Sequence, residues 1–149
     1  MSGCGSSNRP RAVYAHVAFF DLARSSTWPI EIFTERAAQL RNLVTETKAY
    51  RDAAATGQVQ IEDTGDGLSL AFFEDPLASI ECTAEAALQI RSRSDLRVRI
   101  GLHSGPLLET EGLDGTKLTG AAYAEAKRVM EVARPGQILL SVAPYIFPF

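Results

Sequence analysis

Residues 58–73 read QVQIEDTGDGLSLAFF, and this stretch decides the fold. Two β-prone runs, 58–64 and 68–73, flank the tripeptide GDG at 65–67, and Asp-Gly is among the strongest short signals for a hairpin turn. Stretches with apolar residues at helical spacing lie on both sides of the hairpin. The sequence therefore predicts a β-hairpin with one helix before it and another after it.

A buried strand and a long helix are predicted before the hairpin. Residues 12–21 read AVYAHVAFFD, which is rich in β-branched and aromatic residues, and the polar loop DLARSST follows. Pro29 suits the first turn of a helix, and Gly57 provides a stop. Four apolar residues between them recur at helical spacing: Phe33, Ala37, Leu40 and Val44. We expect one long helix in this region.

A second helix and a half-exposed strand are predicted after the hairpin. Asp75 is suited to cap the helix and Pro76 to occupy its first position, and an apolar face continues to Arg91. Residues 96–103 alternate between apolar and polar side chains before Gly-Pro at 105–106 breaks the run. This alternation predicts a strand with one face in solvent.

The last part of the chain contains one more predicted helix. Residues 107–110 could continue as a short partner strand, and 111–117 (EGLDGTK) is predicted to be a loop. The helix follows Gly120 and carries small apolar residues at helical spacing. Pro-Gly at 135–136 stops it ahead of a strand at 137–141 (QILLS).

The order of elements predicts the fold class. It is α+β, a ferredoxin-like β-α-β-β-α-β core with an added β-α-β arm. In this topology the first two strands run parallel with the third strand between them. The end of the first strand therefore lies beside the hairpin turn, and we expect Asp21 and Asp66 to meet there.

Length and composition limit the classes of protein. A chain of 149 residues with a net charge of -3 allows one domain, and its basic residues are not clustered as nucleic acid binding requires. No apolar run approaches the roughly 20 residues of a membrane span, and no signal peptide is recognisable. Cys4 and Cys82 alone support neither a disulfide framework nor a zinc site. We expect a cytoplasmic domain over 11–149, a disordered tail over 1–10, and no nucleic acid or membrane partner.

Two converging carboxylates suggest metal chemistry. Mg²⁺ and Mn²⁺ bind hard oxygen ligands and are often held by one or two carboxylates together with substrate phosphates. Asp21 and Asp66 therefore suggest a nucleotide enzyme. The alternative is structural, because an aspartate in an Asp-Gly hairpin often serves the turn and one that follows a strand often caps the next element.

Four segments in register resemble a known family. They are FFDLARSS, TGDGLSLAF, VRIGLHSGPL and the stretch from Gly120 to Ser141. Together they resemble the catalytic domain of class III nucleotidyl cyclases over about Val13 to Ser141. The resemblance implies conversion of a nucleoside triphosphate to its 3′,5′-cyclic monophosphate and pyrophosphate, for intracellular signalling. It also implies a head-to-tail homodimer, or a heterodimer with another cyclase-like chain, with active sites at the subunit interface.

The resemblance assigns roles to the candidate metal and phosphate residues. Asp21 and Asp66 fall on the family's metal aspartates, which hold two divalent ions, Mg²⁺ or Mn²⁺. The backbone amides of the loop after the first strand would cradle phosphate oxygens: Ala23, Arg24 and Ser25. Arg128 falls on the arginine that contacts phosphate in the transition state. An exposed helix arginine, or Lys127 in its place, is the alternative reading.

The resemblance also assigns two positions that read the base. Glu62 occupies the first, and a glutamate accepts hydrogen bonds from the N1 and N2 donors of guanine, so it favours guanine over adenine. A glutamate on the exposed face of a strand is the alternative. Lys117 occupies the second position and fits neither the adenylyl nor the guanylyl pattern. The base therefore stays open, pyrimidines included.

Two departures from the family bear on activity. Ala124 stands where the family has an asparagine thought to orient the ribose, and losing one preorganised donor can cost on the order of 10²-fold in rate. Tyr123 or Glu125 could replace it. The family domain also usually continues past Ser141 to a phosphate-binding lysine, so the domain is expected to be C-terminally short. These departures keep a second function open, a non-catalytic cyclase homology domain that binds nucleotide or a partner chain as a sensor or scaffold.

Overall fold

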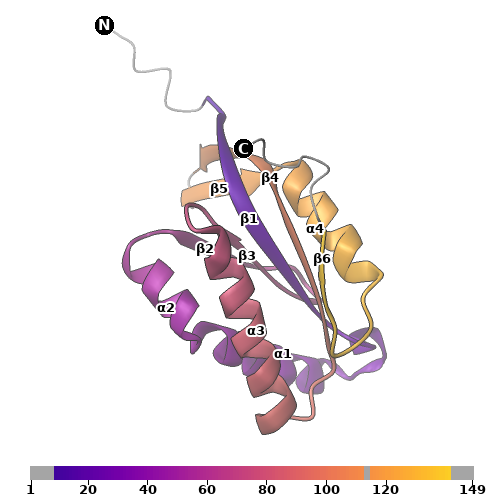
Figure 1. Cartoon of the computed structure of the whole chain (residues 1–149). Helices are drawn as coiled ribbons and strands as arrows, with labels where there is room; N and C mark the ends of the chain where they lie inside the picture. The colour runs from indigo at the N-terminus through magenta and orange to yellow at the C-terminus, as the bar shows by residue number, and fades with distance from the viewer. Residues whose placement is uncertain (1–8, 113–114, 142–149) are drawn as a thin grey trace, which may run out of the picture.

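The molecule is built around one curled β-sheet, seen in a computed structural model that describes residues 9–112 and 115–141 (Figure 1). In chain order the elements are β1 (Arg11–Leu22), a short 3-10 turn (Ser25–Thr27), α1 (Ile30–Thr45), α2 (Lys48–Ala55), β2 (Val59–Asp63), β3 (Gly67–Phe72), α3 (Pro76–Arg93), β4 (Val98–Gly112), β5 (Gly115–Thr119), α4 (Ala121–Glu131) and β6 (Ile138–Leu140). The predicted tail over 1–10 falls largely on residues 1–8, which lie outside the described part.

The strand order is β2-β3-β1-β4-β5, with β6 paired in parallel to β4. β1 is antiparallel to both β3 and β4, and β2 is antiparallel to β3. The first and second strands therefore run parallel with the third between them, which confirms the predicted ferredoxin-like arrangement. β4 is the longest strand, and its outer edge carries β6 beside Ile100–Leu102 and β5 beside Leu108–Gly112.

Two separate cores cover the two faces of the sheet. On one face α3 packs against alternate residues of β1, among them Phe20 and Leu22, and α1 packs against α3 and β3 in the same core. On the other face α4 packs against the intervening residues, among them Val17 and Phe19. Because both faces are covered, the second half of β1 is buried without interruption. This confirms the prediction of a buried first strand.

Glycines allow two close approaches that position the site. A Cβ on Gly67 would lie 1.9 Å from the carbonyl oxygen of Phe20, so β3 can run this close to β1 only without a side chain there. A Cβ on Gly101 of β4 would lie 2.3 Å from the backbone nitrogen of Met130 in α4. These contacts place the hairpin turn and α4 next to the end of β1.

Three predictions about secondary structure are wrong. The expected long helix is divided into α1 and α2, because Thr47 adopts an extended backbone and its side chain caps α2 by accepting from the Tyr50 amide at 3.3 Å. The expected loop at 111–117 is occupied in part by β5, which pairs with the end of β4. Pro106 does not end β4. It lies between the β6 and β5 pairings, so its missing amide proton interrupts no ladder on that edge.

Residues 107–110, expected as a short partner strand, continue β4 instead, whereas the start of α3 agrees with the sequence-based prediction. Asp75 caps α3 by accepting from the Leu77 amide at 2.9 Å, and Pro76 occupies the first position of that helix.

No helix in the described ranges combines the length and apolar character needed to span a membrane.

Candidate active site

Asp21 and Asp66 meet at one edge of the sheet, as the topology predicts. Asp21 is next to last in β1 and pairs with Gly67, while the Leu22 amide donates to the Asp66 carbonyl at 3.0 Å. The two residues line one cavity of about 300 Å³. The remaining lining residues come from strand ends, the hairpin turn and α4: Phe19, Thr64, Arg99, Lys127, Met130 and Glu131. Asp21 is buried, whereas Asp66 is exposed in the turn.

Arg99 is a component of this cavity that sequence reasoning did not assign. It lies opposite Asp21 in the β1–β4 ladder, and its Nη2 and Nε donate to Asp21 Oδ2 at 2.6 and 3.1 Å. Its Nη1 also donates to the Glu131 carbonyl at 3.3 Å. The only signal in the sequence was the alternation of β4, which placed Arg99 on the polar side of that strand without naming its neighbour.

Burial raises the pKa of the Asp21 carboxyl above its ordinary value. Desolvation is the largest cause, because a charged carboxylate loses favourable hydration at this position. The hydrogen bonds and positive charge of Arg99 oppose the rise, and the charges of Asp66 and Glu131 add to it. A cation placed between Asp21 and Asp66 would relieve the repulsion that these carboxylates exert on one another.

The loop after β1 approaches Asp66 from the opposite side. Ser25 and Asp66 line a second hollow of about 260 Å³ beside the 3-10 turn. The Ala23 amide donates to the Arg97 carbonyl at 2.8 Å, so it is already used within the fold. Arg24 has a left-handed backbone, with φ at 62°, which is unusual for a residue with a side chain. Because the Ala23 amide is already bonded within the fold, the amides of Arg24 and Ser25 are the better candidates for binding phosphate.

The two basic residues of α4 face different ways. Lys127 lines the Asp21–Asp66 cavity, whereas Arg128 does not and instead pairs with Glu125 at 2.8 Å on the exposed side of the helix. Within one chain, Lys127 is therefore the helix cation nearest the carboxylates.

Glu62 and Lys117, the two candidate base-reading residues, lie on β2 and β5. The sheet curls enough for a side chain of one strand to contact the other: Gln60 Nε2 lies 3.2 Å from the Thr116 carbonyl and 3.4 Å from Glu62 Oε1. Thr116 immediately precedes Lys117. The curl thus brings the two candidate positions toward each other, although they are far apart in the sequence.

The residues beside Ala124 are occupied with other contacts. Tyr123 packs edge-on against Phe19 at a ring separation of 6.4 Å, and its hydroxyl is buried. Burial, and secondly the charge of Glu62, raise the pKa of Tyr123. Glu125 is paired with Arg128. Glu125 is therefore already engaged, whereas the buried Tyr123 hydroxyl has no hydrogen-bond partner among the described residues.

The oxygen donors at this cavity fit a divalent ion. Asp21 and Asp66 offer carboxylate oxygens at one cavity, which suits Mg²⁺ or Mn²⁺. No cluster of three or more His, Cys, Asp or Glu side chains able to hold a metal occurs within residues 9–112 and 115–141. An ion at this position would take its other ligands from phosphate and water, as Mg²⁺ commonly does. The residues fit an ion that is bound together with a phosphate-bearing substrate.

Solved structures of cyclase domains have a fold similar to that of this chain. Neither a protein-family model nor a curated protein sequence matches the chain. The guanylyl cyclase domain of a rhodopsin fusion protein from the aquatic fungus Blastocladiella emersonii matches with a TM-score of 0.68 and 19% identity, over 89% of this chain and 83% of that one. The same domain has also been solved as a non-canonical dimer.

Two bacterial proteins are similar as well. A light-regulated adenylyl cyclase matches with a TM-score of 0.64 and 20% identity, over 83% of this chain and 41% of that one. An adenylate/guanylate cyclase/hydrolase from Silicibacter pomeroyi matches with a TM-score of 0.59 and 25% identity, over 89% and 78%. The described chain therefore has the fold of the class III nucleotidyl cyclase catalytic domains.

Proposed function

We propose that the protein is a metal-dependent nucleotidyl cyclase that forms a 3′,5′-cyclic nucleoside monophosphate and pyrophosphate from a nucleoside triphosphate. The observation that carries the proposal is the cavity shared by Asp21 and Asp66, at the edge of a sheet with the cyclase fold. The two carboxylates come from different elements and gain no hydrogen bond from each other's side chains. Asp21 is already paired with Arg99, so the proposal depends on the exposed carboxylate of Asp66 sharing its cavity.

The chain's own residues would divide the work as follows. Asp21 and Asp66 would hold two divalent ions, Mg²⁺ or Mn²⁺, which supply activation of the ribose 3′-hydroxyl and charge neutralisation at the phosphates. The amides of Arg24 and Ser25 would donate to phosphate oxygens. Arg99 and Lys127 would offset negative charge from within the cavity. Because Arg128 lies outside it, we propose that Arg128 acts on the site of a second subunit.

A dimer follows from this division of residues. Arg128, Glu62 and Lys117 of one chain would complete the site whose carboxylates belong to the other chain, in a head-to-tail homodimer or with another cyclase-like partner. Glu62 accepts hydrogen bonds and favours guanine. Lys117 can donate to guanine O6 or to a pyrimidine carbonyl, so the substrate is proposed as a nucleoside triphosphate with guanine preferred.

A second function is supported by Ala124. Without the asparagine side chain, and with the neighbouring Glu125 paired with Arg128, the domain would bind nucleotide or a partner chain without turnover. The two functions differ in one observable, the release of pyrophosphate.

The test is incubation of the purified protein with Mn²⁺ and each of ATP, GTP, CTP and UTP, with products identified by mass spectrometry. We expect a cyclic product, with GTP preferred. Asp66→Asn should abolish it, whereas Asp63→Asn, a matched change on the same hairpin outside the cavity, should preserve it. Absence of product from all four nucleotides with a folded dimer, or turnover unchanged in Asp66→Asn, would reject the catalytic proposal.

A further inference from the structure

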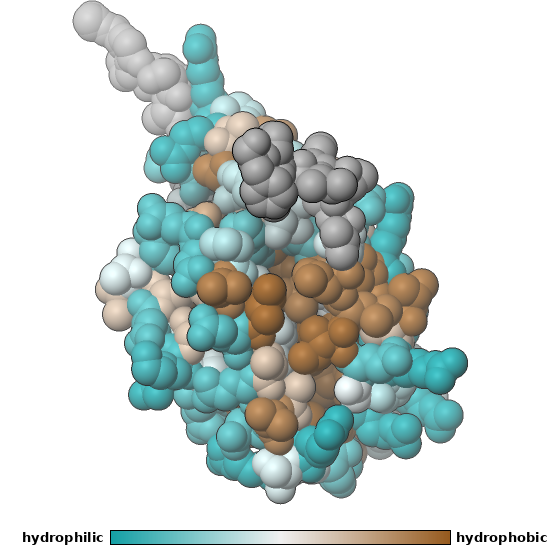
Figure 2. Space-filling model, in the orientation of Figure 1, coloured by the Kyte–Doolittle hydropathy of each residue, from teal (hydrophilic) through white to brown (hydrophobic). Residues whose placement is uncertain are grey.

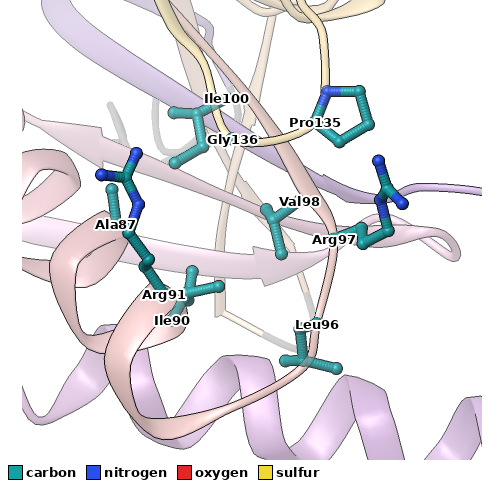
Figure 3. A pocket seen from close by; sticks show the side chains of 9 residues that line it. All are labelled: Ala87, Ile90, Arg91, Leu96, Arg97, Val98, Ile100, Pro135 and Gly136. Atoms are coloured by element: carbon teal, nitrogen blue, oxygen red, sulfur yellow. The ribbon is translucent and has the colours of Figure 1, made fainter.

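The two faces of the sheet differ in whether their polar side chains converge. On the face covered by α3, the hollow at the start of β4 has a floor of core residues that are at most 6% exposed: Ile90, Val98 and Ile100. Arg91 and Arg97 extend to different sides of Val98 there (Figure 3). The surface over α3 and β6 is broadly apolar (Figure 2). On the face that α4 covers, by contrast, polar side chains share one location.

Three paired residues form a row across the sheet on that face. Phe19 of β1 is paired with Ser69 of β3, and Ser69 is paired in turn with Glu62 of β2. Side chains of directly paired residues stand on the same face, with Cβ atoms about 4.5–5.5 Å apart. Because Phe19 belongs to the core under α4, the whole row lies on the α4 side. The row ends at Glu62, a candidate base-reading residue.

Tyr123 of α4 lies over this row. Its ring packs edge-on against Phe19, with an interplanar angle of 89°, and its hydroxyl is buried without a hydrogen-bond partner among the described residues. Burial, and secondly the charge of Glu62, raise the pKa of Tyr123, whereas the Ser69 hydroxyl opposes the rise. The phenol therefore keeps its proton at neutral pH and is available as a hydrogen-bond donor.

Glu62 is the acceptor that this donor lacks. Its side chain is half-buried, and its one hydrogen bond within the described residues is a long one, from Gln60 Nε2 at 3.4 Å. The same Gln60 amide also donates to the Thr116 carbonyl at 3.2 Å, so it is shared between two acceptors. A carboxylate offers about four lone-pair sites. Glu62 can thus accept from the Tyr123 hydroxyl and still accept from a ligand.

We propose that Tyr123 is a positioning residue for Glu62. Its hydroxyl donates to the Glu62 carboxylate of the same chain when a nucleotide is bound, and so fixes the direction in which that carboxylate accepts from the base. Hydrogen bonds of this kind are often loose in the free protein and tighten in the complex. Guanine presents N1 and N2 donors to a carboxylate held in this way, whereas N1 of adenine is itself an acceptor. The inference rests on the proposed nucleotide binding and names a residue that sets its base preference.

The pairing is tested first in the free protein, by NMR of the full chain ¹³C-labelled at tyrosine Cζ. Tyr123→Phe identifies the Tyr123 resonance by its disappearance. Glu62→Gln should shift this resonance, because it removes the charge that the hydroxyl faces. Glu31→Gln, the same change at an exposed position on α1, should leave it in place. An unmoved Tyr123 resonance in Glu62→Gln would overturn the proposal.

The effect on the base is tested with 3′-deoxy-GTP and 3′-deoxy-ATP in the presence of Mg²⁺. Both lack the attacking hydroxyl, so their affinities are measured without turnover. Tyr123→Phe should weaken binding of 3′-deoxy-GTP about tenfold and that of 3′-deoxy-ATP much less, on the scale of one hydrogen bond to a charged group. In the Glu62→Gln background the same change should add no further loss. Tyr14→Phe, at an exposed tyrosine that is edge-on to His16, should behave as wild type.

Two outcomes separate this proposal from the proposed function. Equal losses for the two nucleotides in Tyr123→Phe, or additive losses in the double variant with Glu62→Gln, would overturn the positioning role and leave Tyr123 as a packing residue of α4. Binding of neither nucleotide to the wild-type protein would reject the proposed function. The NMR comparison in the free protein would then still decide whether Tyr123 faces Glu62.

Discussion

Arg99 of β4 lies directly across from Asp21 of β1, and its Nη2 donates to the Asp21 Oδ2 oxygen at 2.6 Å. The Asp21 side chain is only 10% exposed, so this ion pair is largely shielded from water. The same carboxylate is the proposed ligand of a divalent ion. Arg99 therefore provides the counter-charge of Asp21 in the free protein, and the ion must compete with it.

This pair should be strongly coupled in stability. Arg99→Met would leave a buried carboxylate without a partner, and we expect a loss of about 3 kcal/mol in the free energy of unfolding. The double variant Asp21→Asn/Arg99→Met should lose less than the sum of the two single variants, by about 1 kcal/mol or more. Urea unfolding of the four proteins measures the difference. Additive losses would show that the two side chains do not stabilise each other.

The docking of α4 on β4 depends on Gly101. Gly101→Ala should lower the free energy of unfolding by about 3 kcal/mol, because the new methyl group meets the backbone of α4 and the helix must move outward. Gly105→Ala is the matched control on the same strand, where the nearest atom is the movable His103 side chain at 3.3 Å. Gly105→Ala should lower the free energy of unfolding by less than Gly101→Ala does. If the two variants were equally stable, the close approach of α4 would be disproved.

His16 should make the fold sensitive to mild acid. Burial lowers the pKa of His16 below 6.5, and the charge of Asp75 only partly opposes this. Between the two pKa values the unfolded chain binds a proton that the folded protein does not, so the free energy of unfolding rises with pH and falls on acidification. His16→Gln should therefore lose less stability than wild type between about pH 7 and pH 5. Denaturant unfolding at both pH values tests this, and equal losses would exclude a contribution from His16.

The proposed sharing of sites between subunits can be tested by mixing inactive chains. Asp66→Asn and Arg128→Ala should each abolish turnover alone. If Arg128 serves the partner's site, an equal mixture contains heterodimers with one intact site and should recover about a quarter of the wild-type rate. Replacing the second chain by Asp66→Asn/Arg128→Ala should remove the recovery. A mixture that stays inactive after subunit exchange would place Arg128 in the site of its own chain.

Secondary structure was predictable wherever short signals agreed with the topology. The Asp-Gly turn at 66–67 and the Asp75-Pro76 cap were read correctly from the sequence. β5 was missed although Asp-Gly also occurs at 114–115, because the surrounding residues are too polar to signal a strand. The break at Thr47 was missed because apolar residues continue at helical spacing up to Val44, which favoured a single helix.

The sequence by itself determined the order of elements and hence the meeting of Asp21 with Asp66, because strand order follows from hairpin and crossover signals that act over a few residues. Only the tertiary structure decided that Arg99 faces Asp21, and that Lys127 rather than Arg128 enters their cavity. These features depend on strand register and on how α4 is rotated against the sheet. Both are set by contacts between residues far apart in the chain, such as Gly101 with Met130, which no local pattern records.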